Sequence, residues 1–142
     1  MKVRPYIPKD KHKLIALWRS CHLLNPKNDP EKDIGRKLDI KPGWLFVAEE
    51  KGAIVGSVMV GYEGHRGWIN YLAVAPGYRS KGFGRELMNR AEKELKKVDC
   101  PKINLQVRAG NRAVLGFYRR IGYVEDKVVS LGKRLTDDSN SP

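Results

Sequence analysis

The sequence predicts a mixed α/β fold of the α+β type, in which helices cover both faces of one central sheet. Several short stretches alternate apolar and polar residues, which is typical of strands. Other stretches repeat apolar residues at steps of three and four, which is typical of helices with one buried face. Both kinds of stretch follow one another along 142 residues without an internal repeat or an interdomain linker. We therefore expect a single domain over residues 1–142.

The N-terminal third is predicted to hold one strand and two helices. Residues 2–7 alternate and form the strand. Residues 10–24 form the first helix, whose apolar face consists of Leu14, Leu17, Trp18, Cys21 and Leu24. After a loop rich in Asn, Pro and Asp, Asp29 is expected to cap a second helix that has Pro30 in its first turn. The buried edge of this second helix is expected at Ile34, Leu38 and Ile40.

The middle of the chain predicts an antiparallel meander followed by a helix. Strands are expected at residues 43–50, 53–62 and 68–74, separated by turns at 51–52 and 63–67. A helix begins near Phe83, because apolar residues then recur at helical spacing, at Leu87, Ala91, Leu95 and Val98. Cys100 and Pro101 end this helix, and residues 102–108 alternate as a further strand.

The C-terminal part predicts one more helix and one more strand. Asn111 is placed to cap the helix and Gly122 to end it, with a core face expected at Ala113, Val114, Phe117 and Ile121. Residues 128–135 are predicted to form the last strand. The polar segment 136–142 is expected to fray.

Composition narrows the classes of function. The net charge of +12 and the pI of 9.9 raise nucleic acid as a partner. Charge alone supports that reading, because the chain has no zinc-finger spacing, leucine zipper or RNP-like stretch. The two cysteines, Cys21 and Cys100, have no metal-ligand spacing, so no metal is expected. No apolar run approaches the roughly 20 residues of a membrane span, and the first residues lack a signal-peptide pattern, so we expect a cytoplasmic protein without a membrane partner.

A basic, glycine-containing loop follows the third meander strand. Its sequence, Arg-Ser-Lys-Gly-Phe-Gly at residues 79–84, leads directly into the predicted helix. Backbone N–H groups and the positive end of the helix dipole meet there, which suits a phosphate. The loop has neither the GK[ST] ending of a P-loop nor the GxGxxG of a dinucleotide fold. Taken alone, it is equally well read as a loop made flexible by its glycines.

This loop resembles the acetyl-CoA pyrophosphate loop of the GNAT superfamily of N-acetyltransferases. Residues 111–123 resemble the second signature of that superfamily, an Asn, a helix carrying Ala and Tyr, and a closing Gly-aromatic pair. Several further stretches resemble the small bacterial YpeA-type acetyltransferases. The resemblance implies a mostly antiparallel sheet of six to seven strands with four helices on both faces. It also implies transfer of an acetyl group from acetyl-CoA to a primary amine by direct attack in a ternary complex.

The resemblance assigns the acetyl-CoA site to the end of a strand, the loop and the later helix cap. Gly82 and Gly84 are expected to let backbone N–H groups approach the pyrophosphate, with Arg79, Lys81 and Arg85 adding attraction. A backbone N–H of Leu72 or Val74 would polarise the acetyl carbonyl. The implied cofactor-binding residues are Leu72, Ala73, Val74, Arg79, Ser80, Lys81, Gly82, Phe83, Gly84, Arg85 and Asn111.

The resemblance also points to Tyr118 as the general acid, because a phenol with a pKa of about 10 stays protonated at neutral pH and can donate to a leaving thiolate. The alternative is a core tyrosine with a satisfied hydroxyl. For the general base, many relatives carry Glu where this chain has Asn70 and Gln106, and an amide takes up no proton at neutral pH. The base is then a water chain, a carboxylate from residues 25–33, or bulk solvent.

The acceptor surface implied by the resemblance lies on the segment between the first two helices. Carboxylates there would attract a cationic amine, although Asp29 and Glu31 also fit a helix cap and first turn. The expected acceptor-binding residues are Asn28, Asp29, Glu31, Asn70 and Gln106. The acceptor is a small molecule, a peptide or protein N-terminus, or a lysine. The open alternative is a module that binds acyl-CoA or nucleic acid without turnover, and a homodimer is left open as well.

Overall fold

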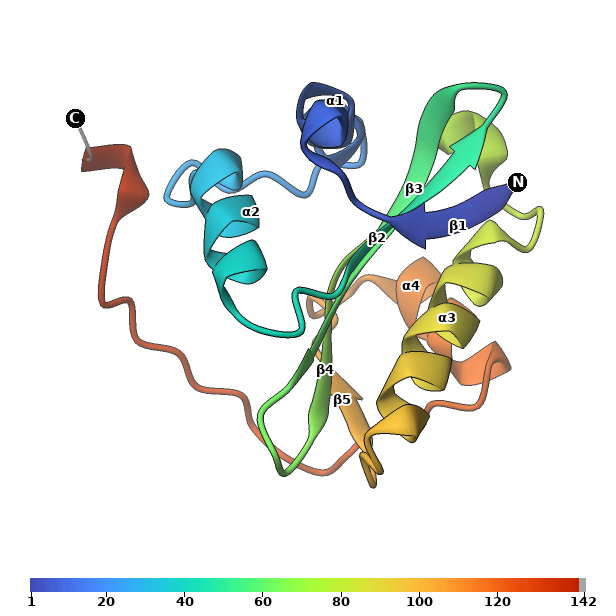
Figure 1. The fold of residues 1–142 in the computed structure, drawn as a ribbon. Helices are drawn as coiled ribbons and strands as arrows, with labels where there is room; N and C mark the ends of the chain where they lie inside the picture. Colours follow the sequence, from blue (N-terminus) through green and yellow to red (C-terminus); the bar gives the residue numbers. More distant parts are fainter. Residues whose placement is uncertain (141–142) are drawn as a thin grey trace.

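The structure, a computed structural model, describes residues 1–140, which form a five-stranded sheet flanked by four α-helices (Figure 1). The strands are β1 (Lys2–Pro5), β2 (Leu45–Glu50), β3 (Ala53–Tyr62), β4 (Gly67–Val74) and β5 (Ile103–Leu105), in the order β1-β2-β3-β4-β5. The helices are α1 (Lys11–Ser20), α2 (Pro30–Asp39), α3 (Phe83–Lys97) and α4 (Arg112–Arg120). Short 3₁₀ turns occupy Pro8–Asp10, Pro76–Tyr78 and Asp138–Asn140. The predicted fold class and the four helices are confirmed.

The sheet separates two apolar clusters, one under each pair of helices (Figure 1). On one face, α1 and α2 pack on the sheet through residues such as Trp18 and Ile34. On the other, α3 supplies Leu87, Met88 and Leu95, and α4 supplies Tyr118. The alternation of β3 and β4 explains the two clusters, because successive side chains of a strand point to opposite faces.

All strand pairs are antiparallel except β4 with β5, which is parallel. This exception follows from the connection, because α3 carries the chain back to the end of the sheet at which β4 begins, and β5 then starts there. Asp29 and Asn111 cap α2 and α4 as predicted, each accepting backbone N–H groups of the first helical turn.

The expected count of six to seven strands is wrong, because the predicted last strand at residues 128–135 does not form. Its apolar side chains lie in solvent instead, with Val128 78%, Val129 85%, Leu131 90% and Leu135 91% exposed. Side-chain contacts hold this part of the chain beside the edge of the sheet: Lys102 and Asn104 contact Asp126, which precedes the stretch, and Gln106, which follows β5, donates to Ser130. β5 is also shorter than the predicted 102–108.

The polar segment after residue 136 differs from the expectation of a frayed tail over its described part. Asp138 is 8% exposed and accepts two hydrogen bonds from the Arg36 guanidinium, at 2.8 and 3.1 Å, and one from the backbone N–H of Asp29, at 3.0 Å. Residues 124–138 therefore run as an extended segment from the edge of β5 to α2 (Figure 1). Residues 141–142 of the predicted tail lie outside the described residues.

Smaller differences concern helix ends and faces. The first helix stops at Ser20 rather than 24, because the following residues take up turn conformations and His22 has a positive φ of 58°. Ile40 follows α2 and is 62% exposed, so it is not part of the buried edge. On α4, Ala113 and Val114 are exposed and Tyr118 is the buried residue, so the core face is rotated from the predicted one.

Candidate active site

The sheet opens between β4 and β5. The two strands pair at Gly67 with Ile103, at Trp68 with Asn104 and at Ile69 with Leu105, and then β5 ends. β4 continues to Val74, paired only with β3. Residues 70–74 of β4 therefore present an unpaired backbone edge toward the gap, and an unpaired edge is a row of hydrogen-bonding groups that a ligand can use.

A β-bulge re-aims the backbone at this edge. Ser57 faces Ala73 but Met59 faces Asn70, so β4 has one more residue than β3 between these pairs. The bulge contains Tyr71 with a φ of 51°, a left-handed conformation that non-glycine residues rarely adopt. Bulges of this kind are frequent next to active sites, where they change the direction of one side chain or N–H group.

Buried hydrogen bonds hold the bulge in place. The Ser57 hydroxyl donates to the carbonyl of Tyr71 at 2.8 Å and accepts from the Trp18 indole N–H at 3.0 Å. Ser57 and Trp18 are fully buried. The Trp18 and Tyr71 rings stack with centroids 3.8 Å apart and planes 13° apart. Trp18 of α1 and Ser57 of β3 thus fix the strained residue of β4.

β4 leads through the 3₁₀ turn Pro76–Tyr78 into the basic loop. Two residues of this loop have positive φ, Ser80 at 63° and Gly82 at 84°, and α3 begins directly after Gly82. The amides of residues 80–85 donate no backbone hydrogen bond within the described chain, and the first such bond of the helix runs from the Glu86 N–H to the Gly82 carbonyl. Free N–H groups at the positive end of a 15-residue helix suit the pyrophosphate of acetyl-CoA.

In the structure, Gly84 and Arg79 have contacts that differ from the roles predicted for them. A Cβ on Gly84 would lie 3.0 Å from the Phe117 ring, so this glycine makes room for α4, whereas a Cβ on Gly82 would meet nothing. Arg79 turns back to β4, where its Nε donates to the Val74 carbonyl at 3.1 Å. Lys81 and Arg85 remain exposed at the loop, with the Lys81 ammonium 5.7 Å from the Tyr78 ring centre.

Tyr118 lies in the same cluster as Leu72, Val74 and Leu105, the residues that border the gap. Only 8% of Tyr118 is exposed, and burial raises the pKa of its phenol to about 12. Its hydroxyl has no hydrogen bond within the described residues, yet among them no buried side-chain N or O atom lacks a partner. The ring is therefore packed while the hydroxyl is not fully enclosed and has no internal partner, which differs from a core tyrosine with a satisfied hydroxyl.

The expected acceptor residues do not all come together. Asp29 caps α2, and Glu31 lies 3.5 Å from the Lys11 ammonium. Asn28 donates its backbone N–H to the carbonyl of residue 25. Gln106 is exposed and its side chain donates to Ser130 in the C-terminal segment. Asn70 is exposed on β4, on the face opposite Ile69, and is the member of the set that borders the unpaired edge.

A contact that the sequence does not reveal joins α2 to the bulge. The Tyr71 hydroxyl donates to Asp33 Oδ2 at 2.7 Å, and burial together with this carboxylate raises the pKa of the phenol. The sequence contains Asp33 among the carboxylates of the acceptor segment, but Tyr71 reads as an ordinary strand residue. A bulge depends on register between two strands, so no local pattern announces it.

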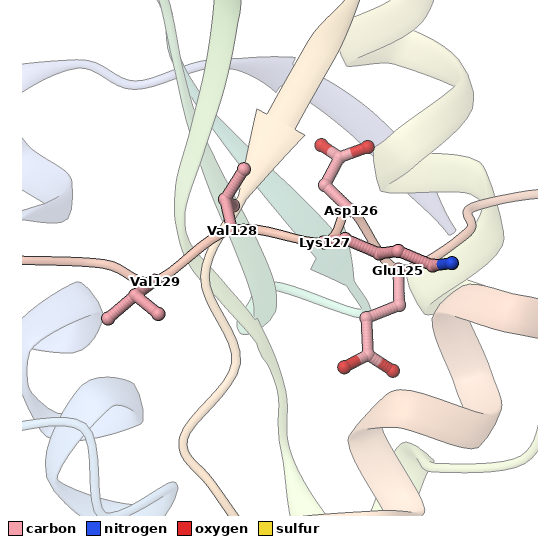
Figure 2. A pocket seen from close by; sticks show the side chains of 5 residues that line it. All are labelled: Glu125, Asp126, Lys127, Val128 and Val129. Carbon is pink, nitrogen blue, oxygen red and sulfur yellow. The ribbon is translucent and has the colours of Figure 1, made fainter.

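One hollow among the described residues lies away from this site. It has a volume of about 520 Å³ and is lined by residues 125–129, whose side chains fan out from one extended stretch (Figure 2). It does not border residues 70–74 or the loop, so we assign it no part in the site. Within residues 1–140, no group of three or more His, Cys, Asp or Glu side chains is arranged to hold a metal ion, and no helix is long and apolar enough to cross a membrane.

Comparisons with known proteins identify the family of this chain. The model of the acetyltransferase (GNAT) family matches residues 12–123. An acetyltransferase of Yersinia enterocolitica is 49% identical over 138 residues, which cover 97% of this chain and 98% of that protein. An acetyltransferase of Sodalis glossinidius is 48% identical over 139 residues, with the same coverage of 97% and 98%.

One solved structure is similar in fold at low sequence identity. AAC(6')-Iy, in complex with the bisubstrate analog CoA-S-monomethyl-acetylneamine, has a TM-score of 0.77 at 16% identity, over 94% of this chain and 97% of that one. This likeness supports the fold, whereas the family match and the curated relatives support the membership. The chain belongs to the GNAT family of acetyltransferases, as its two sequence motifs predicted.

Proposed function

We propose that the protein is an acetyl-CoA-dependent N-acetyltransferase that transfers the acetyl group directly to a primary amine in a ternary complex. The observation that carries the proposal is the continuity of the unpaired edge of β4 with the loop of free amides at the start of α3. The edge suits the acetyl and pantetheine portions of the donor, and the loop suits its pyrophosphate. A cytoplasmic location remains a prediction of the sequence.

The binding residues act through backbone groups as much as through side chains. The amides of residues 80–85 offer hydrogen bonds to phosphate oxygens, and Lys81 and Arg85 add positive charge. At the edge, an N–H of Leu72 or Val74 polarises the acetyl carbonyl, and the bulge at Tyr71 supplies the change in direction that such a contact needs. Asn111, already the cap of α4, is exposed at the helix end and borders the pantetheine arm in the proposed pose.

Tyr118 donates a hydrogen bond to the leaving sulfur in the proposed mechanism. Its pKa of about 12 lies well above the ordinary thiol value of about 8.5, so complete transfer of the proton to the sulfur is uphill. The phenol therefore acts as a general acid by partial transfer of its proton in the transition state, as negative charge develops on the sulfur, and a solvent proton completes formation of the thiol.

Two measurements in sequence test the proposal. Calorimetric titration first measures binding of acetyl-CoA to the protein, with Gly82→Asp as the control, because a carboxylate in the loop repels phosphate. Thiol release is then followed with three amine probes: a peptide with a free N-terminal Ala, an N-blocked peptide with one Lys, and neamine, chosen because a structural neighbour was solved with an acetylneamine analog.

We expect binding that is lost in Gly82→Asp, and thiol release that depends on at least one amine. Absence of acetyl-CoA binding overturns the proposal. Binding without amine-dependent release favours the alternative of a module that holds acyl-CoA without turnover.

A further inference from the structure

We propose that Tyr71 and Asp33 form the path by which the acceptor amine loses its proton, with Tyr71 contacting the amine and Asp33 taking up the proton. This inference rests on the proposed function and selects one carboxylate among the general bases that the sequence left open. The expected base positions carry the amides Asn70 and Gln106, and Gln106 is engaged with the C-terminal segment.

The position of Tyr71 in the backbone is next to the proposed reaction centre. Tyr71 immediately precedes Leu72, whose N–H is one of the two candidates for polarising the acetyl carbonyl. Ile69 and Leu72 both pack on the face of the sheet that carries α3, and the bulge places two residues between them. Asn70 and Tyr71 consequently both turn toward the face that carries α1 and α2. This is the side from which the acceptor segment approaches β4.

Asp33 is the carboxylate of α2 that contacts the sheet at this point. Its side chain is 21% exposed, and its Oδ2 accepts the Tyr71 hydroxyl at 2.7 Å. The Tyr71 ring is fixed by its stack on Trp18, and its carbonyl by Ser57. The ring stack and the hydrogen bond to the carboxylate fix the orientation of the phenol. Its oxygen therefore has a free lone pair with a defined direction, which can accept a hydrogen bond from the N–H of the acceptor amine.

The charged groups nearest to Asp33 come from its own helix. On its own helix, Arg36 approaches Oδ1 at 3.4 Å, but this guanidinium makes its shorter contacts with Asp138 of the C-terminal segment. Lys37, one turn along α2, donates to the Val60 carbonyl rather than to Asp33. From β4 the facing group is Tyr71, whose ring stacks on the uncharged Trp18 of α1. The carboxylate therefore has one partly engaged cation beside it.

The proton balance of the step is complete. The acceptor arrives as an ammonium ion, and one of its protons passes to the Tyr71 oxygen while the phenolic proton passes to Asp33, so Tyr71 ends as it began. Asp33 then releases this proton to solvent. The neutral amine nitrogen bonds to the acetyl carbon, the bond from that carbon to sulfur breaks, the nitrogen loses its second proton to solvent, and the thiolate takes up a proton from solvent. A strongly raised pKa keeps Tyr71 protonated, as a relay requires and a phenolate base does not.

Two conservative variants separate this role from a structural one. Asp33→Asn keeps an oxygen that accepts the Tyr71 hydroxyl, but an amide takes up no proton. Tyr71→Phe keeps the stack on Trp18 and removes the hydroxyl. Asp39→Asn is the matched control, because Asp39 is an exposed carboxylate at the other end of the same helix. Each protein is measured for kcat/KM from pH 6 to 9.5 with the N-terminal Ala peptide, or with whichever amine probe the wild type uses.

We expect Asp33→Asn and Tyr71→Phe to lower kcat/KM about 10- to 100-fold at pH 7, and Asp39→Asn to have no effect. Without the path, the rate follows the fraction of neutral amine, so the loss should shrink as the pH passes the α-amine pKa of about 8. The dissociation constant of acetyl-CoA and the melting temperature of Asp33→Asn should stay at the wild-type values.

The outcomes distinguish the inference from the proposed function. If the wild type acetylates no probe, the proposed function fails and the path fails with it. If the wild type is active and Asp33→Asn matches it at every pH, the proposed function stands and the path is refuted. A loss that is the same at every pH also refutes it, because a structural defect does not depend on the protonation of the acceptor.

Discussion

Removing the Tyr118 hydroxyl is the sharpest single test of the chemistry. The hydroxyl has no hydrogen bond within the described residues, while the ring is packed in the core. Tyr118→Phe therefore keeps the packing and breaks no internal bond, and we expect the free energy of unfolding to change by less than about 0.5 kcal/mol. General acid catalysis contributes at least about 100-fold, so turnover should fall by that factor, equivalent to about 2.7 kcal/mol in the barrier.

Tyr123→Phe provides a control with the opposite expectation. The ring of Tyr123 lies 5.6 Å from that of Tyr118, but its hydroxyl donates to the Glu92 carboxylate at 2.9 Å. Loss of this half-buried bond should lower the free energy of unfolding by about 1–2 kcal/mol and leave turnover within about twofold of the wild type. Urea unfolding measures the first quantity, and thiol release at saturating acetyl-CoA and amine measures the second.

The pH dependence adds a further check on Tyr118. A general acid works in its protonated form, and burial raises the pKa of this phenol to about 12. Deprotonation of Tyr118 should therefore cause no decline of wild-type turnover up to about pH 10. The pH profiles of wild type and Tyr118→Phe should have the same alkaline limb over this range. Equal turnover of Tyr118→Phe and wild type at saturating substrates would refute the assignment, and so would a Tyr118-dependent decline near pH 8.

Three other predictions follow from the packing. Gly84→Ala should lower the free energy of unfolding by about 1–3 kcal/mol, because the new Cβ would lie 3.0 Å from the Phe117 ring, and Phe117→Leu should recover part of the loss in urea unfolding. Ser57→Ala should cost about 1–3 kcal/mol, since a buried indole N–H and a carbonyl lose their partner, and it should lower turnover more than acetyl-CoA affinity by loosening the bulge. Arg36 and the Asp29 N–H lower the pKa of Asp138 to about 2, so their contact stabilises the folded state above about pH 4 and is lost as the pH falls toward 2. The difference in unfolding midpoint between wild type and Asp138→Asn should shrink over that range, and a constant difference would contradict the assignment.

The bulge and the loop are neighbouring segments of the chain, and each is held by its own set of contacts. The loop is held to the sheet by Arg79, whose Nε caps the Val74 carbonyl, and to α4 by the contact of Gly84 with Phe117. The bulge is held by Trp18 and Ser57 on the opposite face of the sheet. Contacts on both faces of the sheet thus support residues 70–84, which gives this segment the rigidity that a binding site needs.

The local patterns of the sequence were sufficient for the elements that form alone. The helical stripe after Phe83, the caps Asp29 and Asn111, and the hairpin at Lys51 and Gly52 are each decided within about ten residues, because spacing and cap chemistry act over one or two turns. The two motifs likewise lie in continuous stretches, so the family followed from the sequence.

Tertiary structure decided what depends on two distant segments meeting. Residues 128–135 have the composition of a strand, but a strand needs a partner with matching register, and the contact of this stretch with the edge of the sheet is a side-chain hydrogen bond from Gln106, just after β5, to Ser130. The docking of Asp138 on α2 joins residues more than 100 positions apart. The same holds for the site: Arg79 to Gly84 could be read from the sequence, whereas the contact of Tyr71 with Asp33 exists only because a bulge in β4 turns one side chain toward a helix 38 residues earlier in the chain.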